Sequence, residues 1–173
     1  RHLTEFWMVE PEIAFCDIDE DIQWAEDLLV YIVKEVLESC IEHLQVLDRD
    51  ISVLEKSISP FPRISYTECI EMLKKDGFNI NWGDDFGAPE ETHIANKYDR
   101  PVIVHRFPAK IKSFYMKRDS EDENVVLGMD VLAPEGYGEI IAYKEKKTNK
   151  LIMFSLVFFD KLNVNLLINC ANR

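Results

Sequence analysis

The chain has 173 residues, 47% of them hydrophobic and 30% charged, so it is long enough for one domain with a buried core. Its formal net charge of -12 argues against broad electrostatic binding to nucleic acid, although a local basic patch is compatible with it. The longest apolar run, residues 151–159, falls well short of the about 20 residues that a membrane span needs, so we expect no membrane association.

The first half of the chain predicts a strand followed by helices. Residues 7–10 alternate as in an edge strand until Pro11 interrupts them. Apolar residues recur at three-and-four spacing through residues 22–47, which predicts a long amphipathic helix preceded by acids that suit its dipole. Ser65 and Glu68 have the spacing of a capping box for a helix over 66–76, and Gly77 follows it. A shorter helix is predicted over 89–98.

The second half predicts a sheet. Residues 101–107, 111–118 and 124–132 indicate three successive strands, and residues 139–143 follow a turn rich in proline and glycine. Residues 151–162 predict one more strand paired back onto this set. The expected fold class is therefore α+β, with an antiparallel sheet flanked by helices.

The stretch MDVLAPEGYGEII, residues 129–141, places Asp130 and Glu139 on two neighbouring strands. Side chains from adjacent strands can converge on one ion or one substrate amine. Mg²⁺ takes one or two carboxylates, with substrate phosphates supplying further oxygens. The alternative is a solvated hairpin with two incidental acids.

The beginning of the chain, RHLTEFW, combines a guanidinium with an aromatic ring. Arg1 and His2 are suited to phosphate, and Phe6 can stack on a purine, which together would bind an adenine nucleotide. The alternative is an exposed chain end followed by a buried phenylalanine.

Five blocks of this sequence occur in the same order in one enzyme family. They read RHLTEFWMVEPEIAF, PFPRISYTECIEMLK, WGDDFGAPEET, PVIVHRFPAKIKSFYM and MDVLAPEGYGEII. They resemble the asparaginyl-tRNA synthetases of the class II aminoacyl-tRNA synthetase family, beginning within motif 2. Aspartyl-tRNA synthetases are the nearest relatives with which the pattern can be confused.

The resemblance implies an ATP site with two ends. Its nucleotide end would comprise Arg1, His2 and Leu3, with Phe6 on adenine. At its metal end Glu139, together with Asp130, would hold the Mg²⁺ that bridges ATP phosphates. No catalytic residue is implied beyond these ligand-binding groups.

Tyr115 and Lys146 are implied for the amino-acid pocket. Lys146 stands where the family has an arginine that binds the substrate carboxylate, and a lysine does not reproduce that bidentate fork. Several residues of the glycine-rich stretch either line the same pocket or form a solvated acidic loop: Trp82, Asp84, Asp85 and Glu91. Lys110 and Lys112 are interpreted as charges at the sheet edge.

The implied reaction uses asparagine, ATP and tRNA(Asn) and passes through an asparaginyl adenylate. Full-length members would act as homodimers in the cytoplasm, or alternatively in a mitochondrion or plastid. The resemblance implies a partial catalytic core over residues 1–143, without motifs 1 and 3. Residues 144–173 form a tail without family resemblance.

These absences predict that the isolated chain does not charge tRNA. Two other interpretations remain: an aspartyl-tRNA ligase or asparagine synthetase of the same fold, and a catalytically dead paralogue acting as a binding module.

Overall fold

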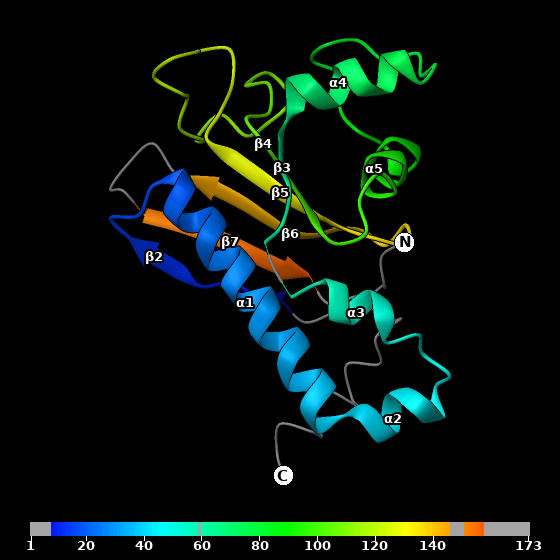
Figure 1. Ribbon diagram of the computed structural model, residues 1–173. Coiled ribbons are helices and arrows are strands. Elements are labelled where there is room, and N and C mark those ends of the chain that lie inside the picture. Colours follow the sequence, from blue (N-terminus) through cyan, green and yellow to red (C-terminus); the bar gives the residue numbers. More distant parts are fainter. Residues whose placement is uncertain (1–7, 59, 146–150, 158–173) are drawn as a thin grey trace.

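The computed structural model describes residues 8–58, 60–145 and 151–157, which form one mixed sheet with helices on both faces (Figure 1). The strand order is β1-β7-β6-β5-β4-β3, and β2 also pairs with β7. The strands are β1 Met8–Val9, β2 Glu12–Ala14, β3 Arg63–Ser65, β4 Val102–His105, β5 Gly128–Ala133, β6 Gly138–Glu145 and β7 Leu151–Val157. The helices are α1 Ile18–Ser39, α2 Ile41–Val46, α3 Ser52–Lys56, α4 Tyr66–Lys75 and α5 Ala88–Ala95.

The predicted α+β class is confirmed, with one change to the sheet. Most neighbouring strands are antiparallel, but β3 and β4 are parallel. Parallel neighbours need a crossover connection, and α4 and α5 lie in the segment between β3 and β4. The edge strand predicted near residue 9 and the strand predicted from residue 151 are both present, as β1 and β7.

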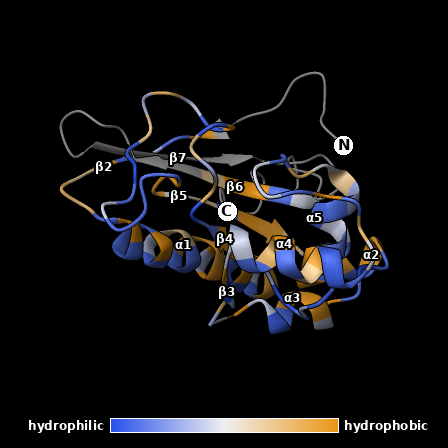
Figure 2. Ribbon diagram, turned by 90° about the horizontal axis from the view of Figure 1, so that it is seen from above, coloured by the Kyte–Doolittle hydropathy of each residue, from blue (hydrophilic) through white to orange (hydrophobic). Residues whose placement is uncertain are grey.

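Two apolar layers follow from the alternation of side chains along β4 and β5. Ile103, Met129 and Val131 face α1, where they pack with residues such as Ile22. Val102, Val104 and Leu132 face the opposite side and pack with α4 and α5. Figure 2 shows the central strands as largely hydrophobic, while the helices carry both hydrophobic and hydrophilic residues. The sheet is thus buried on both faces at its centre. A charged group there requires ion-pair or hydrogen-bond partners.

Helix α1 differs from the predicted helix over residues 22–47 at both ends. It begins earlier, at Ile18, because the carboxylate of Asp17 accepts hydrogen bonds from the backbone N–H groups of Asp19 and Glu20. It ends at Ser39, and the chain continues as α2 after Cys40, whose φ of -121° lies outside the helical region. Serine and cysteine are weaker helix formers than the leucine and glutamate that precede them, which favours a break at this point.

Helix α4 confirms the predicted capping box. The Ser65 hydroxyl accepts from the Glu68 N–H at 3.2 Å, and the Glu68 carboxylate accepts from the Ser65 N–H at 2.8 Å. Gly77 follows the helix with φ +90°, a conformation that glycine adopts without steric cost. Helix α5 carries Pro89 in its first turn, as predicted, and ends three residues before Tyr98.

The strand predicted over residues 111–118 is wrong. This segment turns twice, through hydrogen bonds from the Ile111 N–H to the Pro108 carbonyl and from the Met116 N–H to the Ser113 carbonyl. In place of a continuous ladder, two isolated antiparallel bridges form here, one between Pro108 and Val125 and one between Arg118 and Val126. Ile111, Tyr115 and Met116 pack onto the core beside α4 and α5 instead, whereas Phe114 is exposed. No helix in the described part of the chain is long and apolar enough to cross a membrane.

Candidate functional site

The site is built on the hairpin of β5 and β6. The turn between them uses Glu135 and Gly136 with φ of 62° and 76°, and Gly138 with φ of 81° opens β6. Asp130 lies on β5 and Glu139 on β6, so the two acids are on neighbouring strands as predicted.

A β-bulge determines which face Glu139 occupies. Val131 pairs with Ile141, but the next residue, Leu132, pairs with Glu139, so Ile140 is an extra residue in β6. In a regular strand, residues two apart share a face. Here the bulge leaves Ile141 in the core on the α1 side, while Glu139 reaches a cavity on the opposite face.

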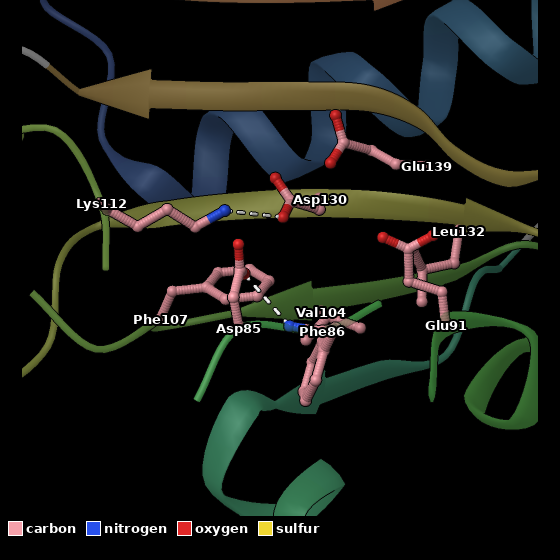
Figure 3. A pocket seen from close by; sticks show the side chains of 9 residues that line it. All are labelled: Asp85, Phe86, Glu91, Val104, Phe107, Lys112, Asp130, Leu132 and Glu139. Carbon is pink, nitrogen blue, oxygen red and sulfur yellow. Dashed lines mark hydrogen bonds and ion pairs between the residues drawn. The ribbon is translucent and has the colours of Figure 1, made fainter. Parts of the chain in front are cut away.

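That cavity has a volume of about 110 Å³ and brings four acids from four segments together. Figure 3 shows the carboxylates of Asp130 and Glu139 from the sheet, Glu91 from α5 and Asp85 from the preceding loop around one space. The full lining is Asp85, Phe86, Glu91, Val104, Phe107, Lys112, Asp130, Leu132 and Glu139.

Lys112 is the cationic member of this lining. Its ammonium donates to the Asp130 carboxylate at 2.9 Å and lies 4.0 Å from the centroid of the Phe107 ring. Burial by itself lowers the pKa of Lys112, but Asp130, Glu139 and Asp85 together raise the pKa above its ordinary value. Lys112 is therefore charged, and its interpretation as a sheet-edge charge is wrong. The error follows from the strand wrongly predicted over residues 111–118.

Aromatic packing fixes the loop that carries Asp85. The Tyr66 ring stacks on Phe86 at 4.9 Å between centroids and lies 5.7 Å from Phe107. The Tyr66 hydroxyl donates to the Asp84 carbonyl at 2.6 Å and accepts from the Gly83 N–H at 2.9 Å. Burial is the main cause that raises the pKa of Tyr66, so this hydroxyl keeps its proton and its donor role.

Of the other residues predicted for the pocket, some line the cavity and some do not. Asp85 and Glu91 line the cavity, but the Trp82 indole donates to the Thr67 hydroxyl at 3.0 Å, away from it. The Asp84 carboxylate accepts from the Asn81 N–H at 2.8 Å within its own turn. Tyr115 packs at the margin of the core beside α4 and α5. The predictions for Arg1, His2, Leu3, Phe6 and Lys146 fall outside the described residues.

The donor set suits a hard cation that brings further ligands. Asp130 and Glu139 offer carboxylate oxygens, the donors that Mg²⁺ prefers. Within the described residues no group of three or more His, Cys, Asp or Glu side chains is arranged to hold a metal alone. Two carboxylates completed by phosphate oxygens and water are the usual magnesium environment in nucleotide sites, so the residues fit Mg²⁺ bound to a nucleotide.

Known proteins share both the sequence and the fold of this chain. An asparagine–tRNA ligase of Desulforamulus reducens is 53% identical over 141 residues, which are 82% of this chain and 33% of that protein. The asparaginyl-tRNA synthetase of Pyrococcus horikoshii, solved with asparaginyl-adenylate, has a TM-score of 0.89 and 34% identity over 98% of this chain and 46% of its own. The chain thus spans a third to about half of these relatives.

The resemblance in fold extends to an aspartyl-tRNA synthetase. The Entamoeba histolytica protein has a TM-score of 0.76 over 91% of this chain and 39% of its own, and at 24% identity it shows the fold alone. The family model described as tRNA synthetases class II (D, K and N) matches residues 1–156, most of the sequence. The chain therefore belongs to the class II tRNA synthetases of this group, as its five sequence blocks indicate.

Proposed function

We propose that this chain serves the ATP-dependent attachment of asparagine to tRNA(Asn) through an asparaginyl adenylate. The observation that carries the proposal is the bulged hairpin, which brings Asp130 and Glu139 to one acidic cavity. The sequence identity to an asparagine–tRNA ligase supports asparagine as the amino acid in preference to aspartate.

In this proposal Glu139 and Asp130 hold Mg²⁺ at the ATP phosphates. The ion, when bound, neutralises phosphate charge and positions the pyrophosphate that will leave. Arg1, His2 and Leu3 contact ATP, Phe6 stacks on adenine, and Tyr115 and Lys146 serve the amino-acid pocket. These assignments, like the core boundary at residue 143, rest on the motif resemblance.

The chemistry needs positioning more than proton transfer. The asparagine carboxylate attacks the α-phosphorus of ATP and pyrophosphate leaves. A hydroxyl of the terminal ribose of tRNA then takes the acyl group from the adenylate, and AMP leaves. Each carboxylate of the cavity lies on a packed element or a loop ordered by Tyr66, so the protein groups are oriented before ligands arrive. Homodimer formation and a cytoplasmic location, with mitochondrion or plastid as alternatives, belong to the same proposal.

A chimera tests the enzymatic function. The homologous segment of the Desulforamulus reducens ligase is replaced by this chain's matching 141 residues, with Glu139→Gln in a second version. We expect asparagine-dependent pyrophosphate exchange in the first version and at least about a hundredfold loss in the second, because a charged ligand of the magnesium ion becomes neutral. Glu71→Gln, on the exposed side of α4, is the matched control.

The outcomes separate the alternatives. Exchange driven by aspartate and not by asparagine would assign the aspartyl specificity. A folded chimera without exchange, whose melting temperature does not respond to ATP and Mg²⁺, would support the binding-module interpretation and refute the proposal. The 173-residue chain alone is expected to show no exchange above an enzyme-free blank.

A further inference from the structure

Lys112 occupies an unusual place for a lysine, because its ammonium lies inside the acidic cavity. The side chain is 21% exposed, and its partner Asp130 is 10% exposed. Four acids and one lysine line the described cavity, so the lining carries a formal charge of -3 with Lys112 and -4 without it.

The surrounding structure holds the ammonium in this place. The turn from Pro108 to Ile111 directs the lysine inward, and the Phe107 ring covers one side of its ammonium. Three carboxylates, those of Asp130, Glu139 and Asp85, interact electrostatically with it. The ammonium therefore lies where these negative charges converge, which is also where a bound cation would be attracted.

We propose that Lys112 is a resident counter-ion of the cation site and makes the site selective for a divalent cation bound to nucleotide over a free one. The proposal rests on the proposed function, in which this cavity takes Mg²⁺ with ATP. Carboxylates close together repel one another, and the ammonium offsets that repulsion when no cation is bound.

The selectivity follows from charge. A free divalent cation is repelled by the ammonium and must share Asp130 with it, so the cation binds weakly. A cation bound to ATP arrives with phosphate oxygens that the same ammonium attracts. Lys112 thereby weakens the binding of the free cation and strengthens the binding of the cation that is bound to ATP. It is a positioning residue that acts through Asp130 and the local charge.

Manganese binding to the 173-residue chain tests this role, because free hexaaquo Mn²⁺ is counted directly by its electron paramagnetic resonance signal. We expect Lys112→Met to bind free Mn²⁺ at least about tenfold tighter than the unaltered chain, since a positive charge beside the ion is lost. The same variant should bind the Mn–ATP complex, measured by isothermal titration calorimetry, at least about tenfold weaker, since the attraction to phosphate oxygens is lost. Lys112→Arg keeps the charge and is expected to stay within about threefold of the unaltered chain for both.

The matched control is Lys110→Met, the same substitution at an exposed lysine two residues away, and it should change neither affinity. If circular dichroism shows that Lys112→Met does not fold, Lys112→Gln is measured with the same expectation. If the Lys112 variant binds free Mn²⁺ with the same affinity as the unaltered chain or more weakly, the counter-ion role is overturned while the metal site stands. Absence of both free Mn²⁺ and Mn–ATP binding in the unaltered chain at millimolar concentrations would instead refute the metal site itself.

Discussion

At the scale of single residues, Asp76 shows how a charged side chain is held by partners that are distant in sequence. The Asp76 carboxylate at the end of α4 accepts from the Lys97 ammonium at 2.7 Å and lies 2.8 Å from the His93 ring nitrogen. These two partners, Lys97 foremost, lower the pKa of Asp76 from its usual value near 4 to about 2. This cluster joins α4 to α5, the helix that carries Glu91 into the cavity.

The lowered pKa of Asp76 predicts how the stability of the fold depends on pH. Because its folded pKa lies below its unfolded pKa, its contribution is present above about pH 4 and is lost as the pH falls toward 2. Asp76→Asn should reduce the change in urea midpoint between pH 4 and pH 2, measured by circular dichroism. Asp48→Asn, at an exposed position whose φ of 51° suits asparagine, should leave that change as it was. Equal pH curves for Asp76→Asn and the unaltered chain would contradict the prediction.

At the scale of elements, the N-terminal cap of α4 was predictable and the segment before β5 was not. The capping box of Ser65 and Glu68 depends on residues three apart, so the sequence contains all of its chemistry. Residues 111–118 contain β-branched and aromatic residues that suit a strand, but a strand also needs a neighbour to accept its ladder of hydrogen bonds. That information lies elsewhere in the fold, and the segment forms turns that place Ile111, Tyr115 and Met116 against the core.

The cap of α4 provides a prediction at this scale. Ser65→Ala removes the acceptor for the Glu68 N–H, so the free energy of unfolding should fall by about 1 kcal/mol in urea titrations. Ser65→Asn keeps a side-chain acceptor and should lower the free energy of unfolding by at most a few tenths of a kcal/mol. Equal losses from both substitutions would show that the hydroxyl is needed for a reason other than capping.

At the scale of the whole molecule, one ion pair connects the helical segment after α1 to the hairpin of the site. The Arg49 guanidinium contacts both carboxylate oxygens of Glu135, at 3.0 Å and 2.5 Å, across 86 residues of sequence. Arg49 follows α2, whose Leu44 packs with the end of α1, and Glu135 lies in the turn between Asp130 and Glu139. Gly136, beside it, approaches Thr92 of α5. The turn is thus held from two sides.

A double-mutant cycle measures this connection. Arg49→Met and Glu135→Gln should each lower the free energy of unfolding by about 1 kcal/mol, and the pair together by clearly less than the sum, because the second change removes a contact already lost. The coupling should decline in 1 M NaCl, since both side chains are partly exposed. Additive losses in urea titrations would show that the contact contributes nothing to stability.

The sequence by itself determined the family, the α+β class, the caps of α4 and the presence of Asp130 and Glu139 on neighbouring strands. Each of these depends on residue identity and short spacing. Only the tertiary structure decided that a bulge at Ile140 places Glu139 on the cavity face, and that Lys112 is buried beside Asp130. A bulge is a mismatch between two strands, and an ion pair 18 residues apart depends on the turns between its members. Neither leaves a periodic signal in the sequence, because both arise from contacts that exist only once the sheet has formed.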